Sequence, residues 1–111
     1  MVKLASMECN PIPKGTPPFG LEQATELLRE IPEWTLNDSS TSISREFRFK
    51  DFHQTMAFVN AVAEIAHQTD HHPHLEVGYN RCKVTFSTHS IGGLSDNDFI
   101  CAARINSLGE S

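Results

Sequence analysis

The sequence predicts an α+β fold, a four-stranded antiparallel sheet with three helices packed on one face. Three segments carry apolar residues at the three- and four-residue spacing of an amphipathic helix, and three shorter ones alternate apolar and polar residues as strands do. With a further extended segment, the order is helix, strand, strand, helix, strand, strand, helix (α-β-β-α-β-β-α). Because single strands do not alternate with single helices, a parallel sheet is not expected, and an antiparallel sheet with helices on one face is the natural two-layer arrangement.

The first 20 residues differ from the rest in composition. They contain four prolines and two glycines, and because proline removes a backbone donor and restricts its neighbours, they predict an irregular arm. Cys9 lies in this arm, and we expect it to face solvent. The whole chain of 111 residues is long enough for one domain with one core. We therefore divide it into a Pro-rich N-terminal arm, residues 1–20, and a single domain, residues 21–111.

The first helix and the first two extended segments follow the arm. Apolar residues at helical spacing from Leu21 to Ile31 predict a helix that Pro32 ends. Trp34 comes next and is expected to be buried against the core. Residues 43–50 alternate as a strand does, and Arg45, which interrupts their apolar face, is placed near the exposed end of that strand.

A second helix and a hairpin are predicted in the second half of the chain. Asp51 has the side chain of a helix N-cap, and an apolar face then runs to about Thr69. Residues 75–79 and 82–87 alternate on either side of residues 80–81. This pattern predicts a hairpin with its turn at residues 80–81.

Charge, hydropathy and cysteine content exclude several classes of protein. The net charge is −5, with nine basic residues scattered among fourteen acidic ones, so no surface for nucleic acid is expected. No segment approaches the roughly 18 apolar residues of a membrane helix, and no secretory signal is recognised. The three cysteines form neither a CxxC pair nor a disulfide framework, which favours the cytoplasm. Cys82 and Cys101 occupy apolar positions and are expected in the core.

Histidines gather where the second helix is expected to end. Three of the six histidines fall within residues 71–74, and His67 lies one helical turn before His71. Imidazole, with an ordinary pKa of about 6.5, exchanges protons at neutral pH and also binds metals. Because Pro73 favours extended backbone before it, the helix should end at Asp70 or His71. The negative end of the helix and Asp70 are then expected to raise the pKa of a histidine there.

The predicted hairpin brings a further histidine to this place. His89 follows the second hairpin strand, and the loops 70–74 and 87–90 become neighbours at the open end of the hairpin. We therefore expect His71, His72 and His89 to lie together at the open end of the hairpin.

Three interpretations of the histidine cluster remain open at this point. The histidines are loop residues in solvent, or His67, His71 and His89 are zinc ligands, or two of them transfer protons as base and acid. A zinc site would lack an HExxH motif and a cysteine pair, and Pro73 disrupts the helical presentation of the ligands. A serine hydrolase is not indicated, because no serine lies in a GxSxG elbow. The pattern favours proton transfer.

The sequence resembles one family over residues 20–108. The signature of that family is an acidic or histidine residue, three further residues, His-His-Pro, an aromatic residue, a later histidine and a later aspartate. In this chain the matching residues are His67, His71, His72, Pro73, Tyr79, His89 and Asp98. Further similarity lies in the segments 32–34, 50–52, 87–89 and 93–95. On these residues the chain resembles the pterin-4a-carbinolamine dehydratases.

The resemblance implies a dehydration that uses neither a metal nor a redox cofactor. The implied substrate is 4a-hydroxytetrahydrobiopterin or a related 4a-hydroxytetrahydropterin, the spent cofactor of aromatic amino acid hydroxylases. Loss of water gives quinonoid dihydropterin, and the implied role is the recycling of tetrahydrobiopterin. The resemblance also implies a homo-oligomer, a dimer or tetramer.

The resemblance further implies roles for individual residues. The implied catalytic set has His71 and His89 as proton donor and acceptor, with His72 binding and orienting the pterin. The residues implied to bind the pterin are Asp70, Ser87, Thr88, Ser90 and His67. Many members have glutamate, which contacts the pterin ring, at the position of His67, and tryptophan at the position of Leu75.

Asp98 has two interpretations. It supports the site by orienting a catalytic histidine, or it caps the last helix. The second interpretation follows from Ser95, which lies three positions earlier and completes the form of a capping box.

Two other functions accompany the dehydratase interpretation. Some members of the family are dimerisation cofactors of a homeodomain transcription factor and use helix surfaces for this, so a non-catalytic binding module is one alternative. Some branches are connected with molybdenum cofactor metabolism, which is the other. No sequence feature specifically supports a binding module, and the same site residues fit both pterin recycling and a role in molybdenum cofactor metabolism.

Overall fold

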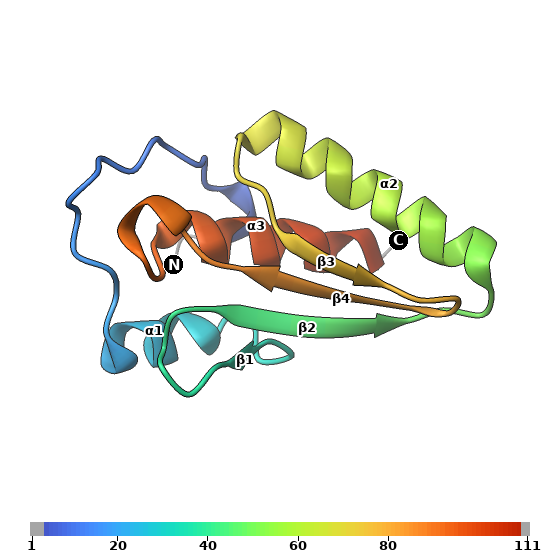
Figure 1. The fold of residues 1–111 in the computed structure, drawn as a ribbon, viewed down its shortest axis with the longest axis horizontal. Coiled ribbons are helices and arrows are strands. Elements are labelled where there is room, and N and C mark those ends of the chain that lie inside the picture. Colours follow the sequence, from blue (N-terminus) through green and yellow to red (C-terminus); the bar gives the residue numbers. More distant parts are fainter. Residues whose placement is uncertain (1–3, 110–111) are drawn as a thin grey trace.

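The computed structural model describes residues 4–109 and confirms the α+β fold (Figure 1). Its helices are α1 (Leu21–Leu28), α2 (Phe52–Thr69) and α3 (Asp96–Asn106). Its strands are β1 (Thr35–Leu36), β2 (Ile43–Arg48), β3 (His74–Val77) and β4 (Arg81–Phe86). Short 3₁₀ helices are η1 (Leu4–Ser6), η2 (His89–Ile91) and η3 (Ser107–Gly109). Within the described residues, no helix is long and apolar enough to cross a membrane.

The sheet is antiparallel, with the strand order β1-β2-β4-β3. β4 directs three buried side chains toward the helices, those of Cys82, Val84 and Phe86. Ile43 of β2 pairs with Phe86 and is buried on the same face. The opposite face carries charged residues such as Glu46, whose carboxylate lies 2.6 Å from Arg48. One apolar and one polar face explain why the helices pack on one side.

The core lies between the sheet and the helices. Val62 of α2 and Trp34 both belong to it, and the expected burial of Trp34 is confirmed at 4% exposure. The indole Nε1 donates a hydrogen bond to Asn106 Oδ1 at 2.8 Å, so burial leaves this donor satisfied. Cys82 and Cys101 are fully buried in the core, as expected.

The hairpin is confirmed, but its turn lies one residue earlier than expected. β3 ends at Val77, and the backbone N–H of Gly78 donates to the carbonyl oxygen of Arg81 at 2.9 Å. The turn therefore consists of residues 79–80 rather than 80–81. Because this difference shifts the paired positions by two, each side chain stays on its expected face.

The expectation that Arg45 lies near the exposed end of its strand is wrong. Arg45 is half-buried within β2, and its Nη1 donates to Asn106 Oδ1 at 2.7 Å. The guanidinium carbon lies 4.3 Å from the centroid of the Phe47 ring. A hydrogen bond and a cation–π contact thus accommodate the charge among apolar neighbours.

Two helix boundaries differ in how well the local sequence predicts them. α1 ends at Leu28, earlier than expected, and Ile31 is buried in the turn that follows. The predicted cap of α2 is confirmed, because the Asp51 carboxylate accepts a hydrogen bond from the backbone N–H of Gln54 at 2.9 Å. A capping side chain is thus a stronger boundary signal here than an apolar spacing.

The arm packs against the domain. Leu4 in η1 is buried, and Cys9 is half-buried, so the expectation that Cys9 faces solvent is wrong. Figure 1 shows the arm passing from beside α3 to the start of α1. Pro18 meets Gly93 so closely that a Cβ on Gly93 would lie 2.6 Å from the Pro18 Cβ. Glycine is therefore required where the arm rejoins the domain.

Candidate active site

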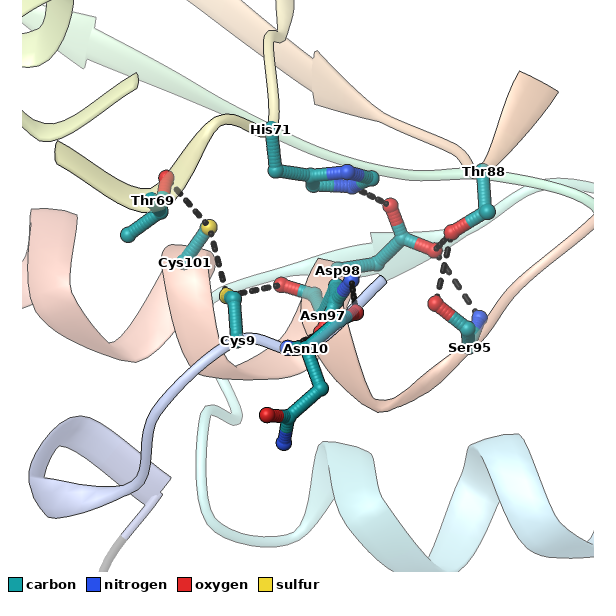
Figure 2. A network of polar contacts seen from close by, with 9 residues as sticks. All are labelled: Cys9, Asn10, Thr69, His71, Thr88, Ser95, Asn97, Asp98 and Cys101. Carbon is teal, nitrogen blue, oxygen red and sulfur yellow. Dashed lines mark hydrogen bonds and ion pairs between the residues drawn. The ribbon is translucent and has the colours of Figure 1, made fainter. Parts of the chain in front are cut away.

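The end of α2 sets the direction of the histidine loop. α2 ends at Thr69, and Asp70 adopts left-handed backbone with φ 52, which aspartate tolerates better than most residues. Pro73 has no backbone N–H, so the chain continues in extended form into β3. The expected break of the helix at about Asp70 or His71 is confirmed, with Asp70 as the residue after the last helical one. The change of direction turns His71 toward α3 (Figure 2).

His71 is held by a carboxylate and an aromatic ring. Its Nε2 lies 2.6 Å from Asp98 Oδ1, and its ring stacks on Phe86 with a centroid distance of 5.7 Å and an interplanar angle of 8°. The side chain is 12% exposed. These contacts fix both the position and the plane of the imidazole.

Asp98 is a fully buried carboxylate in the first turn of α3. Besides contacting His71, it accepts hydrogen bonds through Oδ2 from Thr88 Oγ1 at 2.7 Å and from the backbone N–H of Ser95 at 2.9 Å. The hydroxyl of Thr88 also lies 2.6 Å from that of Ser95 (Figure 2). The predicted capping box is confirmed, and the same carboxylate contacts the histidine. Its burial is tolerated because hydrogen bonds satisfy both oxygens.

The surroundings of His71 raise its pKa. Burial acts to lower the pKa, but the hydrogen bond to Asp98 and the negative charge of Asp98 oppose burial and prevail. Cys101 and Asp70 raise the pKa further. The expected direction is confirmed, with Asp98 rather than Asp70 as the main cause. The imidazole therefore keeps its proton to a higher pH than an ordinary histidine does.

A cavity of about 300 Å³ opens beside His71, and we call it the arm cavity. Residues 9–12 of the arm form one side of it. Four predicted site residues line it, namely Asp70, His71, Thr88 and Ser90. Its volume lies at the lower end of the usual range for small-molecule sites.

A second cavity, of about 340 Å³, lies between α2 and the start of β3, and we call it the helix–strand cavity. His67, His72, Pro73 and Leu75 line it together with apolar residues of α2. Because consecutive residues of an extended chain point to opposite sides, His71 and His72 reach different cavities. His67 and His72 are thus apart from the contact between His71 and Asp98.

The remaining predicted residues lie in the loop after β4. Ser87 and His89 are exposed, on either side of Thr88, which is 5% exposed. The structure therefore brings five predicted residues together, Asp70, His71, Thr88, Ser90 and Asp98. His89 itself does not line the arm cavity, although its neighbours Thr88 and Ser90 both do.

The zinc interpretation named His67, His71 and His89 as ligands. In the structure, His67 and His71 line different cavities and His89 is exposed. Across residues 4–109, no three or more His, Cys, Asp and Glu side chains are placed to hold a metal ion together.

Sequence reasoning missed the contribution of the arm. The backbone N–H of Asn10 donates to Asn97 Oδ1 at 3.1 Å, and Asn97 Nδ2 donates to the carbonyl oxygen of Asn10 at 2.7 Å. Cys9 Sγ lies 3.5 Å from Cys101 Sγ (Figure 2). These partners come from opposite ends of the chain, so no local pattern indicates them.

The protein has an α+β fold, and in its site a buried carboxylate orients one histidine beside a small cavity. Such a site is suited to acid–base chemistry on a small molecule. The family model for pterin 4 alpha carbinolamine dehydratase matches residues 17–108. A Nitrosomonas eutropha protein, provisionally named as a pterin-4-alpha-carbinolamine dehydratase, is 54% identical over 106 residues, which cover 95% of this chain and 92% of that protein. The chain therefore belongs to the pterin-4-alpha-carbinolamine dehydratase family.

Two solved structures have folds similar to that of this chain. The crystal structure of a transcriptional coactivator/pterin dehydratase from Brucella melitensis is 34% identical, with a TM-score of 0.78, and the match covers 82% of this chain and 97% of that one. A pterin dehydratase-like protein identified as a RuBisCO assembly factor in the α-carboxysome is 24% identical, with a TM-score of 0.62, and the match covers 71% and 92% of the two chains. At that identity the second structure supports the fold alone.

Proposed function

We propose that the protein is a lyase that removes water from 4a-hydroxytetrahydrobiopterin or a related 4a-hydroxytetrahydropterin. The C4a hydroxyl leaves with an added proton, the N5 proton is lost, and quinonoid dihydropterin remains. This elimination changes no oxidation state overall. It requires a proton donor, a proton acceptor and a pocket that holds the pterin.

The observation that carries the proposal is the contact between His71 and Asp98 beside the arm cavity. With Nε2 directed at Asp98, the other ring nitrogen, Nδ1, is left to exchange a proton with a bound substrate. The raised pKa favours the protonated imidazole, which is the form that donates to a departing hydroxyl. Asp98 acts as a positioning residue, since it orients the ring and stabilises the imidazolium.

His89 is the proposed partner of His71. It lies between two residues that line the arm cavity, Thr88 and Ser90, and is assigned the N5 proton. His72 and His67, in the helix–strand cavity, are assigned to binding and orientation of the pterin. The arm cavity supplies the further binding residues, Asp70, Thr88 and Ser90, with Ser87 next to them.

The setting of the activity is part of the same proposal. Aromatic amino acid hydroxylases produce the 4a-hydroxylated substrate, so the enzyme serves tetrahydrobiopterin recycling in the cytoplasm. We also propose a homo-oligomer. The positions of β1 and β3 at the two edges of the sheet support this, because an edge strand can pair with a strand of another copy of the chain.

The test is the dehydration rate of a 4a-hydroxytetrahydropterin, followed by ultraviolet absorbance. We expect His71→Ala and His89→Ala to slow the wild-type rate by roughly a hundredfold or more. The matched control is His53→Ala, an exposed histidine in the first turn of α2, and it should keep the wild-type rate. Wild type no faster than buffer would contradict the proposal and favour a non-catalytic binding module. An unchanged rate in His89→Ala alone would remove His89 from the mechanism.

A further inference from the structure

Two cysteines that the proposed chemistry does not use lie beside the site. Cys9 belongs to the arm and Cys101 to α3, and their Sγ atoms are 3.5 Å apart (Figure 2). A disulfide requires about 2.05 Å, so an approach of roughly 1.5 Å joins them. Cys101 is held in a helix, whereas Cys9 lies in a segment without regular secondary structure between η1 and α1. We propose that Cys9 and Cys101 form a reversible disulfide that fastens the arm to α3 at the edge of the arm cavity.

The pair provides a thiolate near neutral pH. The hydrogen bond from Cys9 lowers the pKa of Cys101 to about 7; burial opposes this, and Thr69 and His71 support it. The same hydrogen bond raises the pKa of Cys9, so the two sulfurs share one proton. Burial raises the pKa of the third cysteine, Cys82. Because the thiolate is the form that reacts with oxidants, the pair is more reactive than Cys82.

Cys9 is the sulfur within reach of a small oxidant. It lines the arm cavity and also a polar cavity of about 260 Å³, shared with Glu8, Gln68 and Arg104. Cys101 is fully buried next to it. A proton transfer across the 3.5 Å contact places the thiolate on Cys9, where the guanidinium of Arg104 stabilises the charge.

The oxidant assigned to this site is a small peroxide such as hydrogen peroxide. The Cys9 thiolate attacks one peroxide oxygen and the O–O bond breaks. The hydroxide that leaves takes up from solvent the one proton that the cysteine pair lost on ionisation, and becomes water. The Cys101 thiol then attacks the sulfenic sulfur of Cys9, and the hydroxyl leaves with the Cys101 proton as a second water. The two thiols lose two electrons and the peroxide gains them. A dithiol reductant reverses the reaction.

The disulfide adds a covalent bond to an attachment that already exists. Asn97 holds the backbone of Asn10, the residue after Cys9, through two hydrogen bonds. Residues 9–12 form one side of the arm cavity, and Cys101 lies one helical turn after the buried carboxylate of the site. Oxidation therefore fixes residues 9–12 of the arm, which form one wall of the arm cavity.

The first test is chemical and does not depend on dehydratase activity. The reduced full chain is treated with hydrogen peroxide, digested with trypsin without reductant and analysed by mass spectrometry. We expect residues 4–14 joined to residues 84–104, with a combined mass lower by two hydrogen atoms, and Cys82 as a free thiol. Dithiothreitol should separate the two peptides. Sulfinic or sulfonic acid at Cys9 without the cross-link, or a disulfide between two copies of the chain, would overturn the proposal.

The second test uses variants and the mobility of the arm. Cys9→Ser should abolish the cross-link, and the control Cys82→Ala should keep it. The backbone N–H of Asn10 donates to Asn97, and we expect oxidation to slow its hydrogen exchange by roughly tenfold or more. Cys9→Ser should exchange at one rate before and after peroxide. Oxidised wild type with unchanged exchange at Asn10 would show that the disulfide does not fasten the arm.

Discussion

The neighbouring histidines His71 and His72 lie in different surroundings. His71 is 12% exposed, contacts Asp98 and stacks on Phe86. His72 is exposed and lines the helix–strand cavity. Extended backbone directs consecutive side chains to opposite sides, and Pro73 keeps the backbone extended here. Of two consecutive histidines, one side chain therefore belongs to a hydrogen-bonded network and the other does not.

The difference between the two histidines comes from the carboxylate. Asp98 fixes the ring of His71 and raises its pKa, and the capping box of α3 places that carboxylate. The carboxylate of Asp98 thus both caps the start of α3 and supports the site. We expect changes on the His71 side to alter both stability and activity, and changes on the His72 side to alter mainly the binding of substrate.

The largest effect is expected for Asp98→Asn. Loss of the charge leaves the imidazole buried without its partner, so the dehydration rate should fall by roughly a hundredfold or more. The unfolding free energy should fall by about 3 kcal/mol, because one member of a buried ion pair is removed. Urea unfolding and the absorbance assay measure the two effects. The control is Asp96→Asn, an exposed acid in the same helical turn. Equal effects of both changes would mean that helix charge, and not the contact with His71, matters.

A pH-dependent effect on stability is expected next. Because the folded-state pKa of His71 is raised, its protonation stabilises the fold. This contribution is fully present below the ordinary histidine pKa of about 6.5 and is lost as the pH rises through the folded value. The difference in unfolding free energy between wild type and His71→Gln should therefore be larger at about pH 5.5 than at about pH 8.5. If His72→Gln gave the same pH dependence, the two histidines would not differ as described.

The fold is largely predictable from the sequence because its signals are local. The caps Asp51 and Ser95 and the alternation within β4 depend on residues a few positions apart. The turn of the hairpin is misplaced by one residue, since either position keeps the same alternation of faces. Arg45 is misplaced because its partner, Asn106, comes from the other end of the chain.

The site is predictable only in part. The hairpin indicates that the loops holding His71 and Thr88 meet, and both residues line the arm cavity. The contact between His71 and Asp98 spans 27 positions, and only the family resemblance indicates it. The attachment of Cys9 to α3 has no signal in the spacing, because it depends on how the arm packs across the finished domain.

Removal of the Thr88 hydroxyl, which donates to the Asp98 carboxylate, is a smaller change on the His71 side. Thr88→Val keeps the shape of a buried side chain but removes the donor 2.7 Å from Asp98 Oδ2. We expect a loss of about 1–2 kcal/mol in unfolding free energy. The dehydration rate should fall by roughly tenfold, less than in Asp98→Asn, because the carboxylate remains. Thr85→Val, a half-buried threonine in β4, is the control, and it should leave the rate unchanged.

The smallest effect is expected on the His72 side, for Leu75→Trp. Leu75 is half-buried in β3 and lines the helix–strand cavity, whose volume of about 340 Å³ leaves room for a larger ring. An indole there offers an aromatic face to a flat pterin, so KM should fall by a few-fold. The value of kcat should stay within about twofold of wild type, because the groups that exchange protons lie elsewhere. Steady-state kinetics separate the two constants, and Val77→Trp, an exposed position on the same strand, is the matched control. A large change in kcat would place the reacting atoms beside His72 and reverse the assignment of the two histidines.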